Sequence, residues 1–98
     1  MQNEHEVKYE NEFKTTGKVL SEPIKLLTKN VMEFDILYKE KVKYTVNVSG
    51  KKEDLMVFLN SIKVGDFINI SGKLQLINAT PDYIAYILIH AETISTAV

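Results

Sequence analysis

The stretch VGDFINISGKLQL, residues 64–76, decides the fold of this chain. Apolar and polar residues alternate along it, as they do in a β-strand with one buried face. A Val-Gly-Asp turn stands ahead of the alternation, and Gly72 stands within it, as at a bulge or a sharp bend. We therefore expect a bent strand over residues 67–77.

The residues before this strand are expected to form a helix. In KKEDLMVFLNSIKVGD, residues 51–66, the apolar residues Leu55, Phe58, Leu59 and Ile62 recur at helical spacing and make one stripe. Acidic residues fall in the first turn and a lysine falls near the end, an order that suits the helix dipole. The helix thus leads directly into the bent strand.

A β-hairpin is expected ahead of the helix. From Met32 to Tyr38 every second residue is apolar, with Glu33 and Asp35 on the other face, and the same period resumes from Val42 to Ser49. The short polar turn Lys39-Glu40-Lys41 joins the two runs. This is the clearest local pattern in the sequence.

Two further strands complete the order of elements. A first strand is expected from about Phe13 to Leu20, with a bend at Gly17 and a Ser-Glu-Pro turn after it. A turn at residues 78–82 precedes a last strand over YIAYILIHAETI, residues 83–94. The order strand, strand, strand, helix, strand, strand predicts a five-stranded OB-fold, an all-β Greek-key barrel with one helix between strands 3 and 4. An SH3-like barrel would lack that helix.

Length and charge fit a single small domain. We place an OB-fold domain at residues 13–98 and an acidic tail at residues 1–12. The tail holds four glutamates and one lysine, so the domain keeps eleven lysines and nine carboxylates out of the totals of 12 and 13. The chain has no arginine, which would read guanine by two parallel hydrogen bonds. Sequence-specific recognition of duplex DNA is therefore not expected.

Several classes of protein are not expected either. No apolar run reaches the length of a membrane span, and the polar amino-terminal residues do not resemble a secretory signal. There is no cysteine, no phosphate-cradling glycine loop and no cluster with metal-ligand spacing. We therefore expect a cytoplasmic protein that is not an enzyme and that holds no cofactor or metal.

Four short patterns resemble the bacterial and phage single-stranded DNA-binding proteins. They are Gly17-Lys18-Val19 with Glu22-Pro23, residues 31–36, residues 46–51, and the opening stretch at residues 64–76. Together they extend over roughly residues 17–94. The resemblance implies an OB-fold that binds single-stranded DNA, or RNA, and that assembles as a homo-oligomer.

The chain departs from that family where bases would stack. It has no tryptophan, and Ser49 and Asn69 stand at positions that are often aromatic in the family. Glu33 and Asp35, on the expected outer face of their strand, would repel phosphate. These departures favour the alternative function, a protein-interaction or assembly module that keeps the barrel and binds no nucleic acid. Both functions stay open on the sequence alone.

A surface for single-stranded nucleic acid needs cations for the phosphates and aromatic faces for the bases. Lysines gather on the expected outer faces and at the hairpin turn, while Phe34 and Tyr44 are expected in the core. The predicted nucleic-acid-binding residues are Lys14, Lys18, Tyr38, Lys39, Lys41, Lys43, Phe67, Lys73 and Tyr83.

The last predicted strand is apolar on both faces. A barrel strand has only one inward face, so something must cover the other. We expect a second copy of the chain to do so, with the amino-terminal segment as the alternative cover. The predicted interface residues are Tyr83, Ala85, Ile87 and Ile89.

Overall fold

Alternating residues build a hairpin at the centre of the fold. In the computed structural model, which describes residues 12–97, β3 spans Val31–Tyr38 and β4 spans Val42–Ser49, paired antiparallel along their whole length. Phe34, Ile36 and Val46 point inward and are fully buried. The other elements are β1 (Phe13–Val19), β2 (Ile24–Lys25), α1 (Glu53–Leu59), β5 (Phe67–Ile77) and β6 (Tyr86–Thr96).

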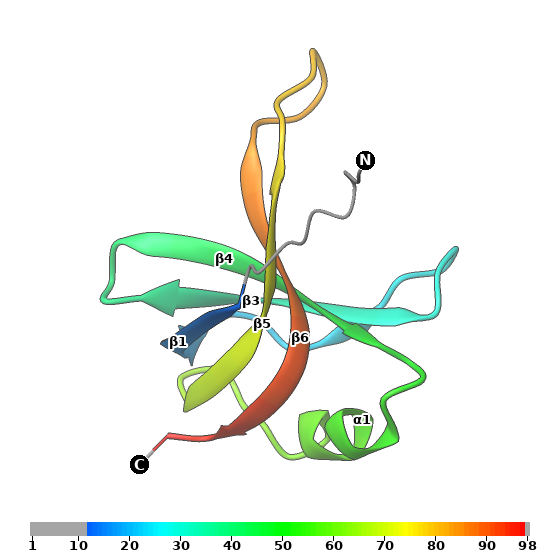
Figure 1. Ribbon diagram of the computed structural model, residues 1–98, viewed down its shortest axis with the longest axis vertical. Helices are drawn as coiled ribbons and strands as arrows, with labels where there is room; N and C mark the ends of the chain where they lie inside the picture. The colour runs from blue at the N-terminus through cyan, green and yellow to red at the C-terminus, as the bar shows by residue number, and fades with distance from the viewer. Residues whose placement is uncertain (1–11, 98) are drawn as a thin grey trace, which may run out of the picture.

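The strands close into a barrel (Figure 1). Their order is β1-β5-β6-β4-β3-β2, and β1 also pairs with β3, which joins the two sides of the sheet. β6 runs parallel to β4 and antiparallel to β5. The five long strands and the helix between β4 and β5 make the Greek-key barrel that the order of elements predicts.

One hydrophobic core fills the barrel, and α1 covers its lower end (Figure 1). Leu55, Leu59 and Ile62 join the core with residues from all five long strands, so three of the four residues of the predicted stripe are buried. The helix itself ends at Leu59, earlier than the stripe. Phe58 is half-buried and packs against the edge of the core.

Two glycines stand where strands approach closely. A Cβ atom on Gly72 would lie 2.1 Å from the backbone carbonyl oxygen of His90, beside the bulge between Ser71 and Gly72. A Cβ atom on Gly17 would lie 2.9 Å from Cδ1 of Ile36. The shift in register between Ser71 and Gly72 confirms the predicted bulge, and the close backbone explains why a glycine stands there.

Three features differ from the prediction or lie beyond it. β2 was not expected, because a pair of residues carries no period and is set by its pairing with β3. The last strand begins at Tyr86, later than predicted. Ahead of it, backbone hydrogen bonds between Thr80 and Tyr83 and the Thr80 hydroxyl, which accepts from the N–H groups of Asp82 and Tyr83, hold a turn. The acidic tail, apart from Glu12, lies outside the described residues.

Within residues 12–97 no helix is long and apolar enough to cross a membrane.

Candidate nucleic-acid interface

A two-part depression lies where the outer faces of β1 and β5 meet the tip of the β3–β4 hairpin. We call it the β1–β5 depression. One part has a volume of about 440 Å³ and the other about 800 Å³, and Thr16, Tyr38 and Lys39 line both. The remaining lining residues are Lys14, Thr15, Gly17, Lys18, Leu37, Glu40, Phe67, Asn69, Ile70, Ser71, Thr93 and Ala97.

Two aromatic side chains stand at this depression. Phe67 is the first residue of β5 and is 49 % exposed, because Ile68 and Ile70 take the inward positions of that strand. Tyr38 is the last residue of β3 and is half-buried, with Lys39 Nζ 5.3 Å from its ring centroid. Neither ring belongs to the core cluster of buried residues, so both have area to offer a stacking base.

Three lysines give the depression a positive charge. Lys14 and Lys18 are four residues apart and therefore lie on the same outer face of β1, alongside β5. Lys39 adds a third ammonium group from the hairpin tip. Among the described lining residues, Glu40 is the only carboxylate. Phosphate groups are therefore attracted to this face.

Hydroxyl and amide groups make the floor between the lysines. The Thr16 hydroxyl donates a hydrogen bond to Asn69 Oδ1 across β1 and β5. Ser71 and Thr93 share a hydrogen bond between their hydroxyls across β5 and β6. The sequence did not single out these residues as a floor, because only the register of the strands brings them together.

The hairpin tip reaches the depression through a tight turn. The backbone N–H of Lys41 donates to the Tyr38 carbonyl oxygen at 2.9 Å, and the two residues between them have positive φ angles: 50° for Lys39 and 59° for Glu40. Left-handed backbone is unfavourable for residues other than glycine, asparagine and aspartate. The turn is nevertheless closed, and it keeps Tyr38 and Lys39 beside β1.

The other predicted nucleic-acid-binding residues lie apart from the depression. Lys43 Nζ is 3.8 Å from an Asp35 carboxylate oxygen on the outer face of the hairpin. Lys73 Nζ is 3.6 Å from a glutamate carboxylate on β6. Lys41 is exposed at the turn without lining the depression, and Tyr83 is 72 % exposed on the β5–β6 loop. Five of the nine predicted residues thus come together: Lys14, Lys18, Tyr38, Lys39 and Phe67.

The predicted interface residues occupy three different environments. Tyr83 and Ala85 lie on the exposed loop before β6, and Ile87 is half-buried. Ile89 is fully buried in the barrel core, so it is not available to a second chain, and its assignment to the interface needs correction. The second apolar face of the strand is partly covered by the chain itself, because Leu88 lies between β5 and β4 and is only 6 % exposed.

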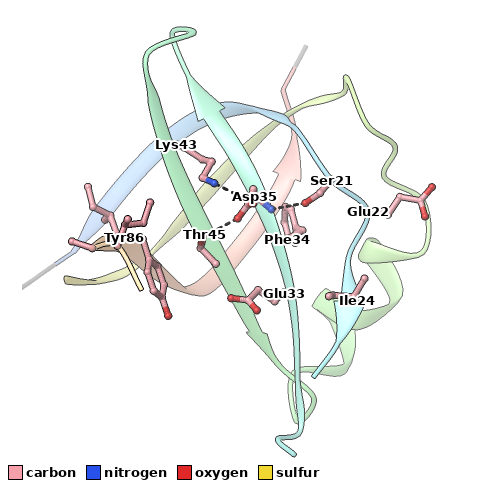
Figure 2. Close-up of a pocket in the computed structure, with 12 residues that line it drawn as sticks. Ser21, Glu22, Ile24, Glu33, Phe34, Asp35, Lys43, Thr45 and Tyr86 are labelled. Carbon is pink, nitrogen blue, oxygen red and sulfur yellow. Dashed lines mark hydrogen bonds and ion pairs between the residues drawn. The ribbon is translucent and has the colours of Figure 1, made fainter. Parts of the chain in front are cut away.

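A separate groove of about 600 Å³ crosses the outer face of the hairpin, and we call it the β3–β4 groove. Figure 2 shows Tyr86 on one side of the hairpin and Ile24 on the other, with Asp35, Thr45 and Glu33 between them. The groove carries more carboxylates than lysines, unlike the β1–β5 depression. Within the described chain, no three His, Cys, Asp or Glu side chains gather as metal ligands would.

No protein-family model matches the chain, and no curated protein matches it. Solved structures do. A small single-stranded DNA-binding protein from Streptomyces coelicolor is similar with a TM-score of 0.75 and 16 % identity, over 93 % of this chain and 97 % of that chain. The second single-stranded DNA-binding protein from Mycobacterium smegmatis is similar with a TM-score of 0.70 and 18 % identity, over 90 % of this chain and 87 % of that chain.

The mitochondrial single-stranded DNA-binding protein from S. cerevisiae is also similar, with a TM-score of 0.69 and 13 % identity, over 88 % of this chain and 91 % of that chain. At such identities the likeness concerns the fold. It confirms the predicted OB-fold and, at the level of the fold, the predicted resemblance to single-stranded DNA-binding proteins.

Proposed function

We propose that this protein binds single-stranded DNA with little sequence preference, and that the β1–β5 depression is the binding site. The observation that carries the proposal is the gathering of two partly exposed rings, Phe67 and Tyr38, with three lysines on one outer face of the barrel. The three similar solved structures described above, each named as a single-stranded DNA-binding protein, add support.

The chemistry of the depression suits contacts to phosphate and to base faces. Lys14, Lys18 and Lys39 would act as point charges, since an ammonium group has no planar fork with which to read a base edge. Phe67 and Tyr38 would stack on any base, because every base has a π-face. RNA offers the same phosphates and bases, so the preference for DNA rests on the named similar structures alone.

The salt dependence of binding follows from the number of lysines. Three phosphate contacts on a single strand give a slope of about −2 for log affinity against log salt, hence a loss of about 20-fold between roughly 50 and 200 mM salt. A labelled oligo-dT titrated with protein, with fluorescence anisotropy as the readout, measures this slope directly.

Charge-matched variants test the location of the site. Replacing Lys14, Lys18 and Lys39 together by glutamine should flatten the slope and weaken binding. The control replaces Lys25, Lys29 and Lys63, exposed lysines that line neither part of the depression, and should keep both affinity and slope. Equal loss in both triple variants would show diffuse attraction to the whole surface, and the proposed site would be wrong.

A second candidate function is a protein-interaction or assembly module, including self-association. It is favoured by the β5–β6 hairpin, which projects beyond the barrel (Figure 1) and exposes Leu76 by 63 % and Ile84 by 83 %. Replacing Leu76 and Ile84 by serine, followed by analytical ultracentrifugation, tests it. A wild-type oligomer that dissociates in this variant supports assembly through the hairpin, whereas a wild-type monomer removes self-association.

A further inference from the structure

The β3–β4 groove has a floor of hydrogen-bond acceptors. Glu33 and Asp35 stand on the outer face of β3, and Glu22 stands at the rim, on the turn after β1 (Figure 2). Lys43 is the only cationic side chain among the described lining residues. The lining therefore carries three carboxylates against one ammonium group, which repels phosphate and attracts cations.

Asp35 is held firmly in this floor. Its Oδ1 atom accepts a hydrogen bond of 2.9 Å from the hydroxyl of Thr45, which is itself buried. Its backbone N–H donates to Ser21 Oγ at 3.0 Å, and its carbonyl oxygen accepts from the backbone N–H of Leu20 at 2.8 Å. The contact to Lys43 at 3.8 Å is long and half-exposed, so it contributes little. A fixed carboxylate thus faces the groove without a strong partner charge.

A further acceptor lies on the same face. Asn47 of β4 is the cross-strand neighbour of Glu33, and its Oδ1 atom is buried with no hydrogen-bond partner within the part of the chain that the structure describes. Asn47 does not line the groove, so this oxygen adds negative polarity behind Glu33 without contacting a ligand. The whole face therefore favours a donor-rich, cationic ligand over an acceptor-rich one.

The walls of the groove are apolar and exposed. Ile24 of β2 is 59 % exposed on one side, and Ile84 is 83 % and Tyr86 37 % exposed on the other. Exposed apolar side chains beside polar groups mark surfaces that bind other molecules, and a peptide can offer apolar and charged side chains together. An inorganic cation would use the carboxylates but leave these walls uncovered.

We propose that the β3–β4 groove binds a basic, partly apolar peptide segment of a partner protein. A lysine or arginine of that segment would lie against Glu33 and Asp35, and a neighbouring apolar side chain would lie against Ile24, Ile84 or Tyr86. This surface lies on other strands than the β1–β5 depression, so the inference does not rest on the proposed nucleic-acid function. The barrel would then carry an anion-binding face and a cation-binding face.

A labelled peptide of alternating lysine and leucine is the probe, with the same peptide carrying glutamate in place of lysine as its control. The wild-type protein should raise the anisotropy of the lysine peptide and leave that of the glutamate peptide unchanged. Absence of binding to the lysine peptide at low salt would overturn the inference.

Variants of opposite sign locate the peptide. Replacing Glu22 and Glu33 by glutamine should weaken binding about fivefold, whereas Lys43→Gln should strengthen it about threefold, as expected for one or two partly exposed charges. Ile84→Ser should also weaken binding, and it should leave the stability of the fold unchanged because Ile84 is exposed. The control replaces Glu53 and Glu92, exposed glutamates outside the groove, and should leave affinity within about twofold.

Two results would refute the location. One is that both glutamate pairs weaken binding alike, which would mean attraction to the general surface. The other is that oligo-dT displaces the peptide from the wild-type protein and binds more tightly to the Glu22→Gln, Glu33→Gln variant. In that case the groove would be a nucleic-acid surface instead of a peptide surface.

Discussion

Phe67 offers the sharpest separation between binding and stability. The residue is 49 % exposed, so its burial contributes about half of the roughly 1.5–3 kcal/mol that a fully buried phenylalanine gains. Phe67→Ala should therefore cost about 1 kcal/mol in the free energy of unfolding. Loss of one stacked base costs about 1–3 kcal/mol, which weakens oligo-dT binding about 5- to 150-fold.

The assay pairs urea unfolding with oligo-dT anisotropy for Phe67→Ala and two companions. Val57→Ala truncates a residue of α1 that is 68 % exposed and does not line the depression, and it should leave binding unchanged. Phe67→Trp keeps an aromatic face and adds the only tryptophan, so its fluorescence should change when DNA binds. A folded Phe67→Ala protein with wild-type affinity would refute stacking at this position.

Three predictions concern the fold around the two surfaces. Gly72→Ala should lower the free energy of unfolding by about 3 kcal/mol or prevent folding, because the new Cβ would meet the His90 carbonyl oxygen at 2.1 Å. A wild-type midpoint in urea unfolding would contradict this. Glu40→Gly should raise the free energy of unfolding by about 1 kcal/mol, because φ is 59° at this residue and glycine adopts that conformation freely. An unchanged or lower midpoint in thermal unfolding would argue against strain in the turn. Thr45→Val should lower the free energy of unfolding in urea by about 1.5 kcal/mol, because the hydrogen bond to Asp35 is lost. Thr45→Ser keeps the hydroxyl and should lower it less. Equal losses in the two variants would assign the effect to packing.

The hairpin and the bent strand were predictable because their signal is local. β3 and β4 match the predicted ranges, since their alternation is long and rich in β-branched and aromatic residues. β5 also matches, with its bulge at Gly72. The start of the last strand was wrong because residues 80–83 form a turn, held by backbone hydrogen bonds between Thr80 and Tyr83 and by the Thr80 hydroxyl. Such contacts have no period that a sequence can display.

The candidate site was predictable only in part, for reasons of curvature and register. Lys39, Lys41 and Lys43 are close in sequence, yet only Lys39 reaches the β1–β5 depression, since the tight turn and the curved barrel carry the others away. Lys43 instead lies in the acidic β3–β4 groove. The surface to which a charged residue belongs depends on its neighbours on adjacent strands, and tertiary pairing fixes these neighbours.

Binding of single-stranded DNA by the lysine- and aromatic-lined face of this barrel is the property to measure first. The most direct test is anisotropy of a labelled oligo-dT at low and near-physiological salt, with unlabelled duplex DNA as competitor. We expect binding that falls about 20-fold between roughly 50 and 200 mM salt and that duplex does not displace. No binding at low salt, or displacement by duplex as effective as by oligo-dT, would contradict it.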